Sequence, residues 1–288
     1  MTKAVLGVIG GSGIYDLPGL ENVREQRIAS PWGEPSGALR IGAIAGLPVV
    51  FLPRHDKGHR LSPSDINYRA NIDVLKRCGV TDILAISAIG SLRDEFAPGH
   101  VVAVDQIIDH TQARERSFFG PGLVAHVSLA DPVCPRLSGL AASAARAAGA
   151  TVHAGGCYIA IEGPQFSTRA ESRLYRGWGA DVIGMTAMPE ARLAREAELP
   201  YALLGLVTDW DSWREDERDV VAEEILGVMK ANAEMARSAV SILAKGLPAR
   251  RKAVPIDRSL DHAIVTAREM RDPALAARLD AVAGRVLR

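Results

Sequence analysis

Strand-like and helix-like segments alternate along most of this 288-residue chain, and this alternation constrains its fold more than any other feature. Residues 5–9, 82–87 and 201–208 are short apolar runs typical of buried strands, whereas residues 68–78 and 137–148 have apolar positions at helical spacing. Strands that alternate with helices build α/β folds, whose central sheet is buried between helices. We therefore expect one α/β domain with a largely parallel or mixed twisted central sheet flanked by helices.

The alternation continues to about residue 250. We expect residues 1–250 to form the domain and residues 251–288 to form a helical C-terminal extension of unknown role. The helical pattern of this extension is interrupted at Asp272-Pro273, because proline fits only the first turn of a helix. A further helix is expected from Thr168, where a threonine followed three residues later by Glu171 predicts a capping box.

Polar and glycine-rich segments follow the predicted strands, and five of them carry chemically useful side chains. These are residues 10–13, 53–55, 86–91, 162–171 and 208–211. Ligands of open α/β sheets bind beyond the carboxyl ends of the strands. Each segment taken alone suits a tight turn or a solvated loop equally well, but their joint order predicts one binding site.

The first three segments have features of an anion site. The Gly-Gly-Ser-Gly run lets the backbone approach an anion, and Ser12 adds a hydroxyl donor. Arg54 offers a guanidinium fork that matches paired oxygens, and His55 stands beside it. Small residues around Ser87 again expose backbone N–H groups and a hydroxyl.

The last two segments have features of a site for a planar base. Phe166 offers a ring for stacking, although a single aromatic side chain is equally consistent with core packing. Asp209 and Asp211 follow a buried strand, where two carboxylates are costly unless they meet a ligand or a positive partner. Asp209 would hold a proton there if its pKa were raised.

Composition excludes several classes of function. Lys and Arg together number 34, as do Asp and Glu, so the chain lacks the basic excess of a nucleic-acid-binding protein. No apolar run approaches the roughly 18 residues of a membrane helix. Cys78, Cys134 and Cys157 form no C-x-x-C pair, which favours reduced thiols and argues against a zinc site. We expect a cytoplasmic protein that binds neither nucleic acid nor membranes.

Together these segments resemble the methylthioadenosine phosphorylase branch of the trimeric purine nucleoside phosphorylases. The resemblance covers roughly residues 5–245. Its strongest stretches are residues 7–15, 53–55, 67–71, 90–93, 162–171, 178–183, 185–186 and 208–211.

The resemblance implies a role for each part of the site. It implies a phosphate site made of Ser12, Arg54, His55, Ser87, Ala88 and Thr186. It implies a nucleoside site made of Phe166, Met185, Asp209, Trp210 and Asp211, with Met185 along the ribose. It implies a homotrimer in which His126 reaches a neighbouring subunit's site, and a 5′-substituent pocket lined by Ala222, Ile225 and Leu226.

The implied reaction needs inorganic phosphate as a co-substrate and no metal or other cofactor. Cleavage of an N-glycosidic bond places positive charge on the ribose and negative charge on the leaving purine. Phosphate would stabilise the cation and attack C1′, while Asp209 would hydrogen-bond or protonate the leaving base as a general acid.

The nature of the base rests on donors and acceptors. A 6-amino group needs acceptors such as Asp209 and Asp211, and the resemblance also makes Ser167 the methylthioadenosine-type residue where the 6-oxopurine branch has glutamate. Gly184 favours a 6-oxopurine instead, because the adenosine branch usually has asparagine there and the inosine/guanosine branch has glycine. We expect phosphorolysis of methylthioadenosine in purine and methionine salvage.

Other functions remain open at this point. A 6-oxopurine nucleoside phosphorylase or a methylthioinosine phosphorylase would use the same site. A nucleosidase would use the same pocket with water in place of phosphate. A non-catalytic nucleotide-binding regulatory domain would use only the first glycine loop.

Overall fold

The structure, a computed structural model, describes residues 1–11, 14–214 and 222–288; at residues 222–226, 229 and 231 it describes the backbone alone. Among these residues, eleven strands form one mixed sheet. Its centre is parallel and runs in the order β5 (Leu47–Pro53), β2 (Leu6–Gly10), β6 (Asp82–Ser91) and β12 (Tyr201–Asp209). The expected α/β fold with a parallel or mixed sheet is confirmed.

Antiparallel strand pairs occur on both flanks of the sheet. On one side β4 (Leu39–Ile44) pairs with β5 and with the edge strand β3 (Glu21–Gln26). On the other side β11 (Val182–Gly184) runs antiparallel to β6, and β10 (Cys157–Ile161) and β8 (Gln106–His110) continue the sheet. β12 also pairs with β7 (Val101–Ala103), which pairs with β9 (Val152–Ala154).

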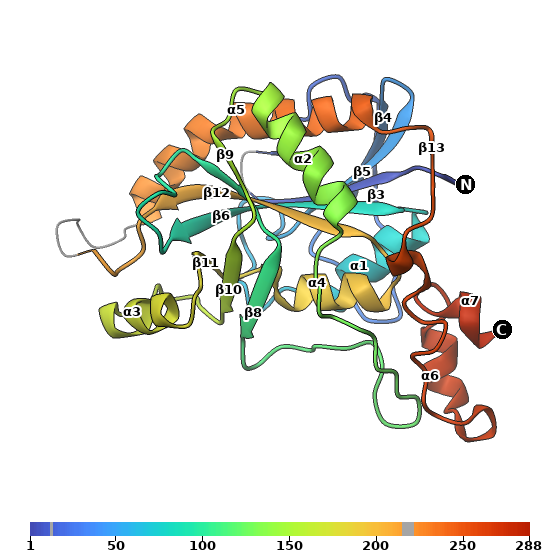
Figure 1. The fold of residues 1–288 in the computed structure, drawn as a ribbon. Coiled ribbons are helices and arrows are strands. Elements are labelled where there is room, and N and C mark those ends of the chain that lie inside the picture. Colours follow the sequence, from blue (N-terminus) through green and yellow to red (C-terminus); the bar gives the residue numbers. More distant parts are fainter. Residues whose placement is uncertain (12–13, 215–221) are drawn as a thin grey trace.

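Helices cover both faces of this sheet (Figure 1). The helices α2 (Pro135–Ala147) and α5 (Ala222–Gly246) lie on one face, and α1 (Tyr68–Arg77) and α4 (Ala187–Glu196) lie on the other. Each face has its own apolar core, one joining side chains of α2 and α5 and the other joining side chains of α1 and α4. None of the helices in the described ranges combines the length and apolar character that a membrane crossing requires.

Local signals explain several helix starts. Asn67 caps α1 by accepting a hydrogen bond from the backbone N–H of Ala70. The predicted capping box is confirmed, because Thr168 and Glu171 exchange hydrogen bonds at the start of α3 (Arg169–Gly177). In both cases a side chain satisfies backbone groups that a helix end leaves without partners.

Two runs of the chain with strand-like sequences are each divided into two strands. Residues 101–110 contain β7 and β8, and residues 152–161 contain β9 and β10. The break in the second run is at Gly155 and Gly156, which both have positive φ. Asp105, at the break in the first run, accepts a hydrogen bond from the backbone N–H of Gly156 at 3.0 Å. This hydrogen bond joins the two break points.

The C-terminal tail is less helical than its pattern indicates. Its α-helices are the short α6 (Pro273–Arg278), capped by Asp272, and α7 (Gly284–Leu287). Its strand β13 (Arg250–Arg251) pairs with β1 (Thr2–Lys3), and the side chains of Leu260 and Val282 belong to the core of α1 and α4. The tail thus packs against the body of the fold, and a domain boundary near residue 250 stays a prediction.

Candidate active site

A cavity of about 730 Å³ lies where the central strands β2, β5, β6 and β12 end. This volume is within the range of small-molecule sites. Its wall includes residues from each of the five segments singled out in the sequence. The predicted site residues on the wall are Arg54, His55, Ser87, Ala88, Phe166, Ser167, Gly184, Met185, Thr186, Asp209 and Asp211.

One end of the cavity gathers hydroxyl and backbone donors. Ser87 on β6 and Thr186, which directly precedes α4, have their hydroxyl oxygens 3.2 Å apart. Met188 near the start of α4 has non-helical φ and ψ, so the regular turns of this helix begin after it. Ala88 and Gly11 line the same cavity, whereas Ser12 lies outside the described residues. This end suits a phosphate group.

Arg54 also lines the cavity, and its guanidinium is already paired with other groups of the protein. Its Nε and Nη2 donate to the carboxylate of Glu190 on α4 at 2.8 and 2.9 Å, and its Nη1 donates to the carbonyl of Ile86 at 2.9 Å. The backbone N–H of Arg54 donates to the carbonyl of Gly10, which joins the ends of β5 and β2. The fork expected to face phosphate is thus directed at Glu190, a partner that no sequence signal indicated.

His55 is buried beside that cation and is neutral at pH 7. Burial, reinforced by the charge of Arg54, lowers its pKa to about 4. Its Nδ1 lies 3.0 Å from the carbonyl oxygen of Leu61. Because a carbonyl only accepts, Nδ1 carries the proton and Nε2 is left as an acceptor. His55 therefore suits a protonated phosphate oxygen, to which its Nε2 would be an acceptor.

The cavity wall also holds two carboxylates. Asp209, the last residue of β12, accepts hydrogen bonds from the hydroxyl of Thr208 at 2.7 Å and the backbone N–H of Asp211 at 2.8 Å. Burial raises the pKa of Asp209, and it raises the pKa of Asp211 to about 6. A carboxyl group with a raised pKa can hold a proton for a leaving base.

One buried polar side chain of the cavity wall has no partner. Oγ of Ser167 is buried and makes no hydrogen bond within the described residues. Buried polar groups are rarely left without a partner. This hydroxyl is therefore available to a molecule bound in the cavity.

The structure gives a steric reason for glycine at position 184. A Cβ atom built on Gly184 would lie 2.1 Å from the hydroxyl oxygen of Tyr158, which is buried on the neighbouring strand β10. That hydroxyl also accepts a hydrogen bond from the backbone N–H of Thr186 at 3.3 Å. The tyrosine on the neighbouring strand therefore leaves no room for a side chain at this position, while the role of Gly184 in the choice of base stays a prediction.

The remaining predicted residues are not placed on the cavity wall. The Trp210 ring instead packs against Trp213 and lies under the guanidinium of Arg214, so its assignment to the nucleoside site is not supported by the wall of described residues. His126 is exposed and bonds through its backbone to the C-terminal tail. The side chains of Ala222, Ile225 and Leu226 lie outside the described residues, although α5 begins at Ala222.

Other wall residues were missed. Leu61, Ser62, Pro63 and Asp65, between β5 and α1, also line the cavity. Arg114 lies behind it with a side chain that is 1% exposed. A loop serine or a single arginine carries no local signal of such a role. In the part of the chain that the structure describes, no three His, Cys, Asp or Glu side chains are grouped to hold a metal ion.

Comparison with known proteins identifies the family. Residues 5–245 match the model of the phosphorylase superfamily. The S-methyl-5′-thioadenosine phosphorylase of Bradyrhizobium diazoefficiens is 61% identical over 290 residues, covering 100% of both chains.

Solved structures agree with this match. A methylthioadenosine phosphorylase from an Antarctic soil metagenomic library is 44% identical with a TM-score of 0.88, over 98% of this chain and 99% of that one. The methylthioadenosine phosphorylase from Schistosoma mansoni in complex with adenine is 36% identical with a TM-score of 0.81, over 84% and 91%. The chain belongs to the phosphorylase superfamily, in the family of methylthioadenosine phosphorylases that its motifs had predicted.

Proposed function

We propose that this enzyme splits 5′-methylthioadenosine with inorganic phosphate into adenine and 5-methylthioribose 1-phosphate. The observation that carries the proposal is the arrangement of one cavity. The hydroxyl groups of Ser87 and Thr186 share its wall with the carboxyl groups of Asp209 and Asp211 and with Ser167. The names of the two relatives, S-methyl-5′-thioadenosine phosphorylase and methylthioadenosine phosphorylase, support the same substrate.

Phosphate occupies the end formed by Ser87, the backbone at Ala88 and Thr186, with Arg54 and His55 beside it. A phosphate oxygen attacks C1′ as the C1′–N9 bond breaks, and its negative charge stabilises the cationic ribose. Met185 lies along the ribose. The electron pair of the broken bond passes to the purine, so the reaction needs a proton donor at the base end.

Asp209 supplies that proton at N7, which its raised pKa permits. The acceptor oxygens of Asp209 and Asp211 receive hydrogen bonds from the 6-amino group, and Phe166 stacks on the base. No metal or other cofactor takes part. The contact with Tyr158 offers a steric reason for Gly184 that does not depend on a 6-oxopurine.

The assembly and setting are part of the same proposal. The enzyme acts in the cytoplasm, in purine salvage, as a homotrimer. His126 of one subunit reaches the site of the next, which is consistent with its exposure outside the cavity of its own chain. A rotation that closes a ring permits such sharing of residues. Ala222, Ile225 and Leu226 line the pocket for the methylthio group.

The test is a kinetic panel. Purified enzyme is given methylthioadenosine and methylthioinosine, each with and without phosphate, and release of base is followed. We expect phosphate-dependent release of adenine, faster than release of hypoxanthine. Faster turnover of the inosine compound would overturn the base assignment, and release without phosphate would identify a nucleosidase.

A further inference from the structure

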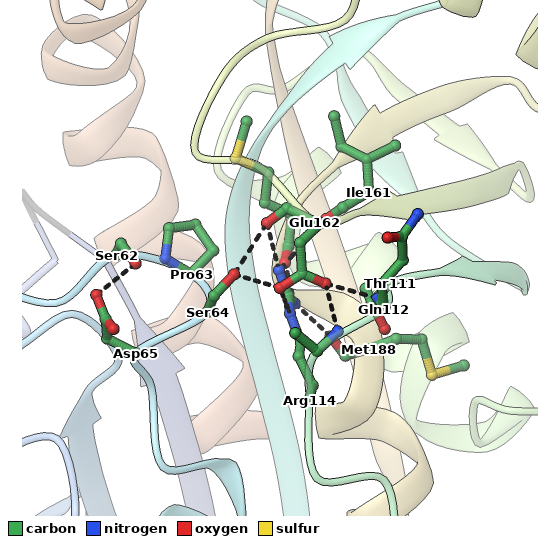
Figure 2. Close-up of polar contacts among 12 residues, drawn as sticks. Ser62, Pro63, Ser64, Asp65, Thr111, Gln112, Arg114, Ile161, Glu162 and Met188 are labelled. Carbon is green, nitrogen blue, oxygen red and sulfur yellow. Dashed lines mark hydrogen bonds and ion pairs between the residues drawn. The ribbon is translucent and has the colours of Figure 1, made fainter.

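Arg114, whose side chain is 1% exposed, stands at the centre of a network of polar contacts (Figure 2). Its Nη1 donates to the carbonyls of Met185 and Met188 at 2.5 and 2.7 Å. Its Nη2 donates to the carbonyls of Glu162 and Ile161 at 2.7 and 3.3 Å. One guanidinium thereby joins the end of β10 to the segment that links β11 and α4.

Glu162 extends the network to two more loops. Its carboxylate pairs with Nε of Arg114 at 3.3 Å and accepts hydrogen bonds from the hydroxyl of Ser64 and the backbone N–H of Gln112. Burial acts to raise the pKa of Glu162, but the bonds from Ser64 and Gln112 and the charge of Arg114 lower it to about 2. Glu162 is therefore ionised at every physiological pH, and the network is fully charged.

The network holds the cavity wall without being part of it. The cavity is lined by Ile161, Met185 and the loop residues Ser62, Pro63 and Asp65. The network residues Arg114, Glu162 and Ser64 do not line the cavity, but they lie next to these wall residues in the chain or in space. These wall residues come from three separate parts of the sequence. The shared attachment of all three is the network of Arg114, Glu162 and Ser64.

We propose that Arg114 is a positioning residue for the nucleoside half of the site. It fixes Met185 against the ribose and fixes the loop after Ile161 that carries Phe166 and Ser167. A planar guanidinium can donate to several acceptors at once in fixed directions, which lysine's ammonium cannot reproduce. The inference rests on the proposed function only for the identity of the ligand. The geometry of the network around Arg114 does not depend on that function.

A purely structural role is the alternative, and Arg251 is the matched control for it. The Arg251 side chain is 4% exposed and is also fully engaged, by Asp82, Asp257 and the carbonyl of Thr81. It ties the tail to the sheet and does not line or support the cavity. Loss of either arginine lowers stability, but only loss of Arg114 would move wall residues of the site.

The experiment compares Arg114→Lys, Arg114→Met and Arg251→Met. For each variant we measure the melting temperature, kcat, KM for methylthioadenosine, KM for phosphate, and adenine affinity by calorimetry. Misplacement of a substrate by about 1 Å costs on the order of 100-fold in rate. We expect losses of kcat/KM for the nucleoside of that order in both Arg114 variants, with weaker adenine binding and an unchanged phosphate KM. Arg251→Met should melt earlier with unchanged kinetic constants.

Ser64→Ala keeps the inference testable if the Arg114 variants fail to fold. It removes one donor to Glu162 and leaves the arginine in place, so a smaller rise in nucleoside KM is expected at an unchanged phosphate KM. Folded variants with wild-type nucleoside KM and adenine affinity would overturn the inference, as would equal losses in Arg251→Met. A wild-type enzyme that binds adenine without splitting methylthioadenosine would instead refute the proposed function alone.

Discussion

Arg54 and Glu190 form a two-pronged ion pair, with Nε to Oε2 at 2.8 Å and Nη2 to Oε1 at 2.9 Å, between side chains that are each 1% exposed. The hydroxyl of Tyr201 donates to the same carboxylate at 2.8 Å. A buried charge is tolerable only when it is paired. Glu190 thus neutralises and orients the arginine for which the sequence predicted a phosphate partner.

We predict that Glu190→Ala destabilises the enzyme strongly. Removing one partner of a buried pair leaves an uncompensated charge and costs about 3–5 kcal/mol. Chemical denaturation at pH 7 measures this loss in the free energy of unfolding. Added phosphate should recover part of the loss, because an anion that binds only the folded state stabilises it.

The matched control is Arg258→Ala, which breaks an ion pair whose arginine is 68% exposed. Exposed pairs contribute at most about 1 kcal/mol, so this variant should unfold almost as the wild type does. A similar small change in Glu190→Ala would contradict the buried pairing of Arg54.

Asp211 predicts an unusual dependence of stability on pH. Burial raises its pKa from 3.8 to about 6, so the folded state binds more protons than the unfolded state between these values. Stability from this group is complete below pH 4 and is lost as pH rises through 6, a loss of about 3 kcal/mol. We predict that Asp211→Asn is more stable than the wild type at pH 7, and that the difference disappears near pH 4.

Denaturation curves between pH 4 and pH 8 measure this difference. Asp280→Asn is a control of opposite sign, because a hydrogen bond from Arg77 lowers the pKa of Asp280. A carboxyl group with a lowered pKa adds stability above its unfolded pKa, so this variant should be less stable than the wild type at pH 7. Equal effects of the two substitutions would contradict the assigned environment of Asp211.

The site's broad plan was predictable because it depends on topology. Arg54 follows β5, Asp209 ends β12 and Ser87 lies in the second half of β6, and the carboxyl ends of parallel strands meet at one edge of a sheet. Once the alternation of strands and helices predicts a parallel centre, the convergence of these side chains follows. The capping box at Thr168 was predictable for a simpler reason, since all its partners lie within four residues.

Pairings between distant residues were not predictable in this way. Glu190 meets Arg54 from a position 136 residues away, and Tyr158 meets Gly184 across two strands of different parts of the chain. No local pattern encodes such contacts. The exposed strand β3 was missed because its residues Glu21–Gln26 are all exposed and show no alternation of apolar and polar side chains.

We predict that Asp209→Asn lowers kcat for methylthioadenosine by about 10²–10⁴-fold, the usual contribution of a positioned acid or base. An amide cannot deliver the proton that the leaving purine needs. It also presents a donor where the 6-amino group needs an acceptor, so 6-oxopurine nucleosides should lose less activity. Steady-state kinetics with methylthioadenosine and methylthioinosine measures both effects.

The Asp65→Asn variant is a suitable control. Asp65 also lines the cavity, but it lies in the loop between β5 and α1, where its carboxylate accepts a hydrogen bond from the hydroxyl of Ser62. It should retain the preference between the two bases. An Asp209→Asn enzyme with unchanged preference would show that Asp209 does not contact the purine edge.

The contact of Tyr158 with Gly184 predicts that the two positions depend on each other. A Cβ at Gly184 would lie 2.1 Å from the tyrosine hydroxyl, so Gly184→Asn should cost at least the roughly 1–3 kcal/mol of an overpacked core. Tyr158→Val leaves a cavity but removes the obstruction. We predict that the double variant is more stable than the sum of the single losses, by about 0.5–3 kcal/mol of coupling. Denaturation of all four proteins measures this coupling. Additive losses would mean that the hydroxyl does not occupy the side-chain space of Gly184, and glycine would again count as evidence for a 6-oxopurine.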